Sequence, residues 1–182
     1  ATFSDGSELP NWLTFDAETL TFSGTPVNKD ICKLNISVTA TDNDGESISD
    51  TFDLEVINVN DAPILENEII NQTATEDEAF SFTLSVNTFN DIDAGDSLTY
   101  TATLADGGEL PNWLTFDAAT RTFSGTPVNE DVGTLSIKVT ATDNDGESAS
   151  DTFELQVVNV NDAPTLLSAI ANQTATEDEA FS

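Results

Sequence analysis

The sequence contains no histidine, no methionine and a single cysteine among its 182 residues. Without histidine, neither a Ser/His/Asp nor a Cys/His catalytic arrangement can be assembled. Carboxylate pairs of the glycosidase kind stay open in principle, but among 34 acidic residues any one pair is uninformative. One cysteine also allows no disulfide within the chain, so a small domain of this kind needs another staple, usually a metal. We therefore expect a protein that is not an enzyme.

Basic residues are scarce as well, since four Lys and Arg stand against 34 Asp and Glu, a formal charge of -30. Nucleic acid needs Lys and Arg for its phosphates, so this composition excludes it as a partner and suits a chain that binds cations. No hydrophobic run approaches the roughly 20 residues of a membrane span, and we expect no membrane insertion. Against disorder, 38% hydrophobic residues and eleven Phe provide enough apolar surface for a core.

The chain repeats itself at an offset of 101 residues. Residues 8–81 align without a gap on residues 109–182, and 57 of these 74 positions are identical. A period near 100 is too long for a solenoid unit and fits a β-sandwich domain. We expect an excerpt of a longer array with three parts: a partial repeat lacking its first strands at 1–61 (the head repeat), a complete repeat at 62–162, and the start of a third at 163–182 (the tail).

Alternation of apolar and polar residues, broken by Gly, Asp, Asn and Pro, runs through the complete repeat and predicts an all-β chain. Seven short strands in about 100 residues are typical of an immunoglobulin-like Greek-key sandwich, so we expect tandem sandwiches of this kind. An initial strand is expected at 69–75. The residues expected to face inward from the other strands are Phe80, Phe82, Leu84, Val86, Leu98, Tyr100, Ala102, Leu104, Leu114, Phe116, Phe123, Leu135, Ile137, Val139, Ala141, Phe153, Leu155 and Val157.

Acidic clusters fall at the predicted loops and linkers. The sandwich topology places Asp91, Asp93, Asp143 and the linker residues Asn60 and Asp61 at one end of the complete repeat. Glu76 and the turn at 129–131 are expected at the opposite end, beside the next linker. Calcium takes six to eight oxygen ligands and accepts them from separate loops. Carboxylates crowded at one end repel unless they share a cation, which favours a metal site there.

A simpler interpretation is that these residues only form turns, since Asp, Asn and Gly dominate turns for backbone reasons. An EF-hand is excluded, because Asp143-Asn144-Asp145 is followed at once by Gly146 without the further ligands that such a loop requires.

Several motifs together resemble a known family. The linker Asn-Val-Asn-Asp-Ala-Pro at 58–63, the run at 91–96, Ala141-Thr142-Asp143 and Glu76 look like the calcium motifs of cadherin repeats. The segments Leu-Pro-Asn-Trp-Leu-Thr-Phe-Asp at 110–117 and Phe-Ser-Gly-Thr-Pro at 123–127 are similar to the dystroglycan-type cadherin-like, or immunoglobulin-like, repeats of large bacterial surface and secreted proteins. The acidic Leu-Asp-Arg-Glu type motif of animal cadherins is absent, with the residues at 129–131 only roughly in its place.

What the resemblance implies is a calcium-binding repeat. It assigns ligand roles to Glu76, Asp91, Asp93, Asp143, Asn161, Asp162, Asn58, Asn60, Asp61 and Asp42. The implied function is that of a structural repeat in an extracellular adhesin or matrix protein, secreted or held at the cell surface, whose junctions calcium makes rigid. The expected partners are neighbouring repeats of the same protein.

An alternative function is a carbohydrate-binding module. Leu114 and Phe116 alternate inward, which puts Trp113 out of phase with the core. A partly exposed indole beside Asn112 could stack on a sugar ring of a polysaccharide. The competing structural interpretation is that Trp113 covers an edge of the sandwich or packs on a loop.

The head repeat is expected to be an incomplete sandwich. The faces that carry Leu34, Ile36, Val38, Phe52 and Leu54 would be partly uncovered and one strand edge unpaired. An open edge can pair with another chain, so if the head repeat is ordered in isolation we expect head-to-tail copies, with the tail as the donor. The alternative is that preceding residues of a longer protein cover the edge.

Overall fold

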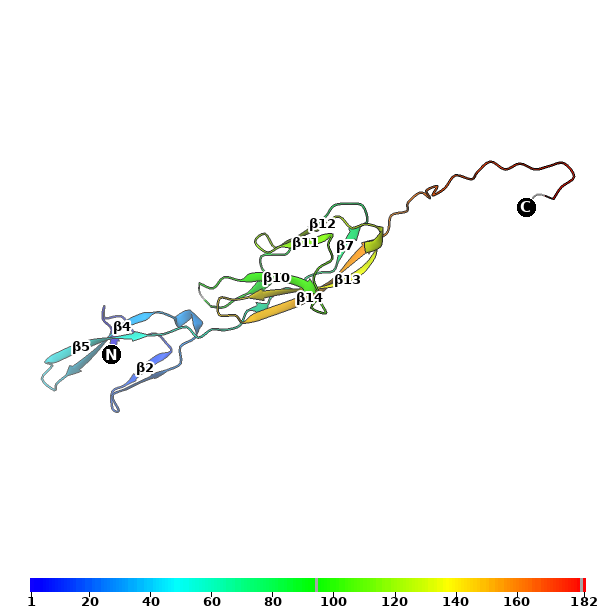
Figure 1. The fold of residues 1–182 in the computed structure, drawn as a ribbon. Helices are drawn as coiled ribbons and strands as arrows, with labels where there is room; N and C mark the ends of the chain where they lie inside the picture. The colour runs from blue at the N-terminus through cyan, green and yellow to red at the C-terminus, as the bar shows by residue number, and fades with distance from the viewer. Residues whose placement is uncertain (94, 181) are drawn as a thin grey trace.

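The computed structural model describes residues 1–93, 95–180 and 182, and Figure 1 shows the head repeat, the complete repeat and the tail following one another end to end. Strands make up the regular structure of the described residues, together with two short 3-10 turns, η1 (Asn28–Asp30) and η2 (Asn129–Asp131). None of the helical segments in these residues has the length and hydropathy needed to cross a bilayer.

The larger sheet of the complete repeat has four strands in the order β10-β13-β14-β7. These are β10 (Thr99–Leu104), β13 (Gly133–Thr142), β14 (Ser148–Val158) and β7 (Gln72–Thr75). β10, β13 and β14 are antiparallel, whereas β7 runs parallel to β14 with Leu155 opposite Gln72 and Val157 opposite Ala74. β7 therefore closes the sheet along the end of β14 that leads into the next linker.

The second sheet contains β11 (Leu114–Asp117), β12 (Thr122–Gly125) and β8 (Phe80–Thr83), in that order. These seven strands confirm the prediction of an all-β, seven-stranded sandwich. A further short pair, β6 (Ile64–Leu65) with β9 (Phe89–Asn90), was not predicted. β9 ends immediately before the acidic run at 91–96, so this pair positions that loop beside the linker.

The core lies between the two sheets. The predicted alternation on β13 and β14 holds, because Ile137, Val139 and Leu155 are fully buried. From the second sheet, Phe123 is 1% exposed and meets Phe153 edge-on with ring centroids 5.6 Å apart. Edge-to-face aromatic pairs add to the stability gained by burying apolar area. Two sheets joined by such contacts hold the loops at each end in fixed relative positions.

Three details of the sequence prediction were wrong. Val86 is 73% exposed rather than inward, because β8 ends at Thr83 and the chain turns at residues 85–88 to enter β9. The first strand begins at Gln72, although Ile69 is still buried. Leu98 precedes β10, which begins at Thr99, and packs against the core from outside the strand.

The head repeat contains β1 (Thr2–Phe3), β4 (Lys33–Thr41) and β5 (Ser47–Glu55) in one sheet. β2 (Leu13–Asp16) and β3 (Thr21–Gly24) pair separately. Within the described residues, no strand stands beside β5 where β7 stands beside β14, and none stands beside β3 where β8 stands beside β12.

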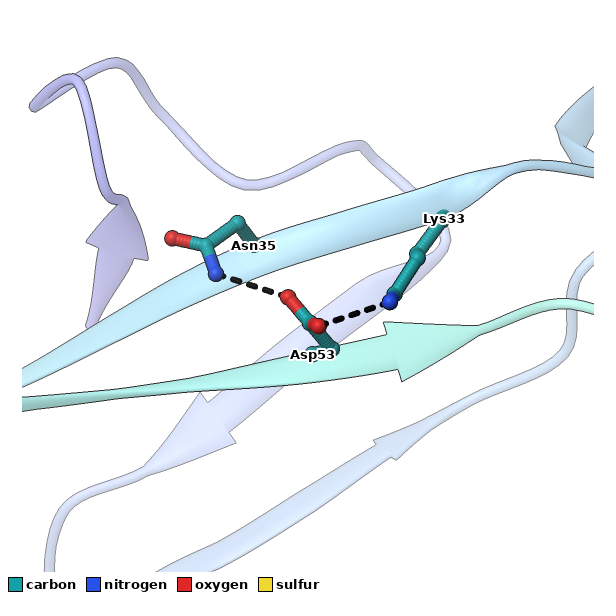
Figure 2. Close-up of polar contacts among 3 residues, drawn as sticks. All are labelled: Lys33, Asn35 and Asp53. Atoms are coloured by element: carbon teal, nitrogen blue, oxygen red, sulfur yellow. Dashed lines mark hydrogen bonds and ion pairs between the residues drawn. The ribbon is translucent and has the colours of Figure 1, made fainter.

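The uncovered face of the head repeat was predicted in part correctly. Phe52 is 40% exposed, Leu34, Val38 and Leu54 are half-buried, but Ile36 is fully buried. On the outer side of the hairpin, Asp53 accepts a hydrogen bond from Asn35 at 2.7 Å and pairs with Lys33 at 2.8 Å (Figure 2). The described residues of the tail form no strand, and all of them are exposed.

Candidate metal centre

Three carboxylates meet in the loop between β9 and β10. One oxygen each of Asp91, Asp93 and Asp96 lies within 4.8 Å of the other two. The loop folds this way because the Asp93 N–H donates to Asp91 Oδ1 at 2.9 Å and the Asp96 N–H donates to the Asp93 carbonyl. Asp93 is only 4% exposed. Like charges this close and this buried disfavour one another strongly unless a cation or hydrogen-bond donors compensate them.

The linker and the head repeat reach the same carboxylates. The Asp61 N–H donates to Asp93 Oδ2 at 2.7 Å. The side-chain amide of Asn28, in η1, donates to Asp61 Oδ2 at 2.7 Å and to Asp93 Oδ1 at 3.1 Å. Groups from a turn of one repeat, the linker and a loop of the next repeat therefore meet at one place, which we call the upstream junction.

The β13–β14 hairpin contributes Asp143 to this junction. Asp143 Oδ1 accepts hydrogen bonds from the N–H groups of residues 145–147, at 3.0, 2.7 and 2.8 Å. Its Oδ2 accepts from the Asn60 amide at 3.0 Å, and the same amide donates to Glu147 at 3.1 Å. The Asn60 amide, followed by the backbone donors, holds the pKa of Asp143 below its usual value, because hydrogen bonds to a carboxylate favour its charged form.

Asn144 joins the hairpin to the acidic loop. Its amide donates to Asp96 Oδ1 at 3.1 Å, and its Oδ1 accepts from the Ser97 hydroxyl at 3.0 Å. The acidic loop and the Asp143 hairpin are therefore parts of one centre.

Several oxygens at the upstream junction have no hydrogen-bond partner among the described residues. They are buried and belong to Asn60 (Oδ1), Asp91 (Oδ2) and Asp96 (Oδ2). A buried polar atom left without a partner costs free energy, so native proteins supply one in nearly every case. Carboxylate and amide oxygens are the ligands that Ca²⁺ prefers. The residues present therefore fit a hard divalent cation.

The downstream end of the complete repeat carries a second group around the next linker. Glu76 is 1% exposed, its Oε2 accepts from the Val160 N–H at 3.1 Å, and its buried Oε1 has no partner among the described residues. The Asn129 amide donates to Asp162 Oδ2, and the Asn161 amide donates to the Asp162 carbonyl at 3.3 Å. Asn129 and Asp162 are the counterparts of Asn28 and Asp61 at the offset of 101 residues. Their contact therefore repeats the Asn28–Asp61 contact of the upstream junction.

A model of the “Putative Ig domain” family matches residues 1–57 and again residues 62–158. The chain belongs to this family. Both repeats described above are thus immunoglobulin-like units of one kind, in agreement with the strand order and with the sequence repeat.

Among curated proteins, the chain is similar to the “Serine-rich adhesin for platelets” of Staphylococcus aureus strain USA300. The two are 31% identical over 149 residues, which cover 82% of this chain and 6% of that protein. The chain thus spans a small fraction of the length of this relative.

Among solved structures, the chain resembles cadherin segments. Mouse Cadherin-23 EC22-24 aligns with a TM-score of 0.62 and 19% identity, covering 84% of this chain and 52% of that one. Human CDH23 EC21-23 aligns with a TM-score of 0.60 and 19% identity, covering 87% and 59%. At this identity the likeness shows the fold, which is that of tandem cadherin-like sandwiches.

Two of the ten residues assigned by resemblance take no part in the contacts at either end of the complete repeat. Asp42 is exposed and holds its own hairpin by accepting hydrogen bonds from the N–H groups of Asp44 and Glu46. That hairpin lies at the other end of β5 from the linker, about 30 Å away for nine extended residues. Asp42 is the head-repeat counterpart of Asp143. Asn58 is exposed and lines a recess of about 310 Å³ together with Asn28 and Asp61.

Sequence reasoning missed Asn28 and Glu147, and did not single out Asn144 or Asp96 within the acidic clusters that contain them. A signal for Asn28 was present in the repeat. Its counterpart Asn129 lies in the turn that was expected to face the next linker, and the offset of 101 transfers that expectation to Asn28. Asn144 and Glu147 gave no such signal, because residues of this type are common in any hairpin turn.

Trp113 was expected to be partly exposed and out of phase with the core, and only the partial exposure is confirmed. The side chain is half-buried and packs against the core cluster, while Asn112 is exposed. The indole itself lies against β12, because a Cβ added at Gly125 would lie 3.0 Å from Trp113 Cε3. Close packing of this kind favours the structural role of Trp113 over sugar binding.

Proposed function

We propose that the chain is a calcium-binding structural repeat of a large extracellular adhesin, in which calcium makes the junctions between repeats rigid. The observation that carries this proposal is the set of buried oxygens without partners at a junction to which two repeats and their linker contribute. A cation there would neutralise carboxylates that otherwise repel and would hold the linker on the complete repeat, while the Asn28 amide ties the head repeat to the same carboxylates.

The residues that would hold the cation at the upstream junction come from the linker and from two loops of the complete repeat. They are Asn60, Asp61, Asp91, Asp93, Asp96 and Asp143. At the downstream end they would be Glu76, Asn161 and Asp162. Calcium supplies positive charge and flexible coordination by six to eight oxygens. The chain itself supplies the alignment. The Asn28 amide already bridges Asp61 of the linker and Asp93 of the acidic loop. The Asn60 amide joins the linker to Asp143 and Glu147 of the β13–β14 hairpin.

Similarity to a staphylococcal adhesin supports a place at the cell surface, as one of many units in a long protein. Within such an array each unit would extend and stiffen the stalk rather than carry out chemistry. The charge of -30 supports the same proposal, because the carboxylates of one junction repel one another and a bound cation would offset that repulsion.

Calorimetry in chelator and in millimolar calcium tests the proposal. Calcium that binds only the folded state at a hundredfold excess over Kd stabilises it by about 2.7 kcal/mol. We expect calcium to raise the melting temperature of the complete repeat, and we expect Asp93→Ala to abolish most of that rise. Glu109→Ala, which removes an exposed carboxylate of the same repeat, is the matched control and should keep it.

The quantity to compare is the calcium-induced shift of each variant, since Asp93→Ala also removes hydrogen bonds that do not depend on calcium. An equal calcium-induced shift in both variants would mean that calcium acts only through general charge screening. No shift in the unmodified chain would rule out the calcium proposal.

A further inference from the structure

The two basic residues of the complete repeat lie beside one edge strand. β10 is the outermost strand of the larger sheet, next to β13. Arg121 places its guanidinium carbon 5.8 Å from the centre of the Tyr100 ring, on the core side of β10. Lys138 stands directly opposite Thr103 of β10, on the outer face of the sheet. In a chain of charge -30, the edge of β10 is therefore where the complete repeat gathers its positive charge.

The edge of β10 has unpaired backbone groups. The Ala105 N–H donates to the Ser136 carbonyl, so the odd-numbered residues of β10 bond to β13 and the even-numbered residues direct their N–H and C=O groups outward. Of the latter, Leu104 is bonded to the turn that follows the strand. The backbone groups of Tyr100 and Ala102 have no partner among the described residues. Such groups are a template for an added strand.

A recess of about 510 Å³ opens beside this edge. Its lining residues are Leu98, Thr99, Tyr100, Ala118, Ala119 and Arg121. They come from the start of β10 and from the turn between β11 and β12, so the recess lies between the two sheets, along the edge at which β10 is outermost. All seven strands of the sandwich are in place around it, and the recess is therefore a feature of a complete repeat.

Arg121 has no acidic partner, although the chain contains 34 acidic residues. Among the described residues its guanidinium forms no ion pair, and its buried Nε has no hydrogen-bond partner. The acidic residue of the same turn, Asp117, is engaged by the N–H groups of residues 119 and 120 instead. A buried donor without a partner costs free energy, and the guanidinium fork matches a carboxylate. The recess therefore offers donors to a carboxylate of another molecule.

The head repeat shows which part of this arrangement the fold requires. The backbone of the turn is the same in both repeats, since Arg121 has φ 55° and its counterpart Leu20 has φ 54°. Only the charge differs. Where the head repeat has Leu20, the complete repeat has Arg121, and two positions earlier Ala119 stands in place of Glu18. Both differences make the recess more positive, and the turn itself folds without either of them.

We propose that the edge of β10 binds an extended segment of a partner protein, which adds as a strand and places an acidic side chain in the recess beside Arg121. On the added strand, the side chain opposite Tyr100 lies on the same face of the sheet as Tyr100, because directly opposed residues share a face. That face borders the recess, so a Glu at this position meets the guanidinium. Backbone pairing gives the affinity and the acidic side chain gives the specificity. This inference goes beyond the proposed function, since it assigns a class of partner to the complete repeat.

Repulsion by the rest of the acidic chain is weak at this edge. The acidic loop before β10 ends at Asp96, four residues from Tyr100, which is about 13 Å in an extended chain. At physiological ionic strength the Debye length is about 8 Å, so charges at that separation are largely screened. The nearby Arg121 and Lys138 therefore decide which segment is preferred.

NMR titration of the 182-residue chain tests strand addition. The titration is done in physiological salt with chelator, so its result does not depend on the calcium proposal. The probe is the peptide acetyl-Thr-Val-Thr-Glu-Thr-Val-Thr-amide, and the matched control peptide has Gln in place of Glu. We expect both peptides to shift the amide signals of Tyr100 and Ala102. The Glu peptide should bind about tenfold more tightly, because its hydrogen bonds with Arg121 are charge-assisted.

Three results of this titration would overturn the proposal. The first is the absence of shifts at millimolar peptide, or shifts confined to other strands. The second is equal affinity for the two peptides. The third is a shift of the Tyr100 and Ala102 signals on raising the protein concentration without peptide, which would make the occupant of this edge a second copy of the chain.

Arg121→Leu separates the charge from the edge. It introduces the residue of the equivalent head-repeat position, so the turn should fold as before. We expect it to abolish the preference for the Glu peptide and to leave the binding of the Gln peptide unchanged. Lys33→Thr is the matched control, because it also removes one positive charge and introduces the residue of its own counterpart, Thr134. It should keep the preference, and an equal loss in both variants would overturn the role of Arg121.

Ala102→Pro tests the edge itself. A proline is tolerated on an edge strand where the N–H faces outward, but it cannot donate to an added strand. We expect both peptides to bind about tenfold more weakly, through the lost hydrogen bond and the unpaired carbonyl left on the peptide side. Unchanged binding of both peptides by this variant would overturn strand addition.

Discussion

The head repeat and the complete repeat place nearly the same sequence in two different environments. Phe52 and Phe153 occupy equivalent positions on equivalent strands, yet Phe52 is 40% exposed and Phe153 is 2% exposed. The difference comes from β7 and β8, which cover one repeat and have no counterpart in the described residues of the other. Strands distant in sequence decide how deeply a side chain is buried here. The local sequence decides which strand the residue belongs to and which face of the sheet its side chain occupies.

The hairpin of the two long strands is the same in the two repeats. Ile36 and Ile137 are both 0% exposed, and both hairpins keep their full antiparallel register. The hairpin is therefore the part of the fold that does not depend on the covering strands.

The largest expected effect is that of Phe153→Ala. Removing a fully buried Phe costs about 3–5 kcal/mol, through lost transfer free energy and the cavity left behind. Phe52→Ala should cost less than half as much, because water already reaches its ring. Urea unfolding at low protein concentration measures both losses. Trp113 kept as the single tryptophan follows the complete repeat, and Trp12 kept as the single tryptophan follows the head repeat. Similar losses would mean that the face of Phe52 is covered in solution.

Asp143→Ala should destabilise the complete repeat more than Asp42→Ala destabilises the head repeat. Asp143 accepts from three backbone N–H groups and the Asn60 amide, whereas Asp42 accepts from two backbone N–H groups within its hairpin. Loss of Asp143 leaves more donors without a partner and releases the linker. Hydrogen exchange at residues 58–61 provides the measurement: Asp143→Ala should increase it and Asp42→Ala should not. An unchanged linker in both variants would show that Asn60 does not hold the junction.

Acid should weaken the complete repeat through Asp143. Its pKa is lowered in the folded state, chiefly by the Asn60 amide and then by backbone N–H groups. A carboxyl of this kind contributes stability above its unfolded pKa, about 3.9, and that contribution is lost as the pH falls through the folded value. Asp143→Asn should therefore flatten the decline in stability of the complete repeat below about pH 4. Urea unfolding from pH 2 to pH 7 measures the stability of the unmodified chain and of Asp143→Asn. If stability falls equally with pH in both, Asp143 is not the origin of the acid sensitivity.

The smallest expected effect belongs to the ion pair shown in Figure 2. Hydrogen bonding and charge from Lys33 lower the pKa of Asp53, with help from the Asn35 amide. The side chains are 63% and 49% exposed, so solvent and salt screen their attraction. Lys33→Ala should change the stability of the head repeat by an amount close to the error of a urea titration. The complete repeat has Thr134 and Glu154 at these positions and folds without such a pair. A clear loss of stability would indicate that the open head sheet depends on its surface contacts.

Much of this molecule could be predicted from local sequence patterns. The offset of 101 defined the repeats, and the alternation at 135–141 and 153–157 identified the strands and their buried faces, because side chains on a strand point alternately to opposite sides. The segment at 85–98 was predicted less well. Val86 continues an alternating pattern, but the chain leaves β8 at Thr83 to reach β6, a partner that no local pattern reveals.

The candidate site divides in the same way. Sequence alone was enough to identify the acidic loops and, by their order along a sandwich, the end of the repeat at which Asp91, Asp93 and Asp143 lie. Only the tertiary structure decided that Asn28 of the preceding repeat bridges Asp61 and Asp93, that Asn144 ties the hairpin to Asp96, and that Trp113 packs on the core. The physical reason is range: alternation and turn chemistry act over a few residues, whereas these contacts join groups 33 to 65 residues apart and form only when two sheets and a linker are already in place.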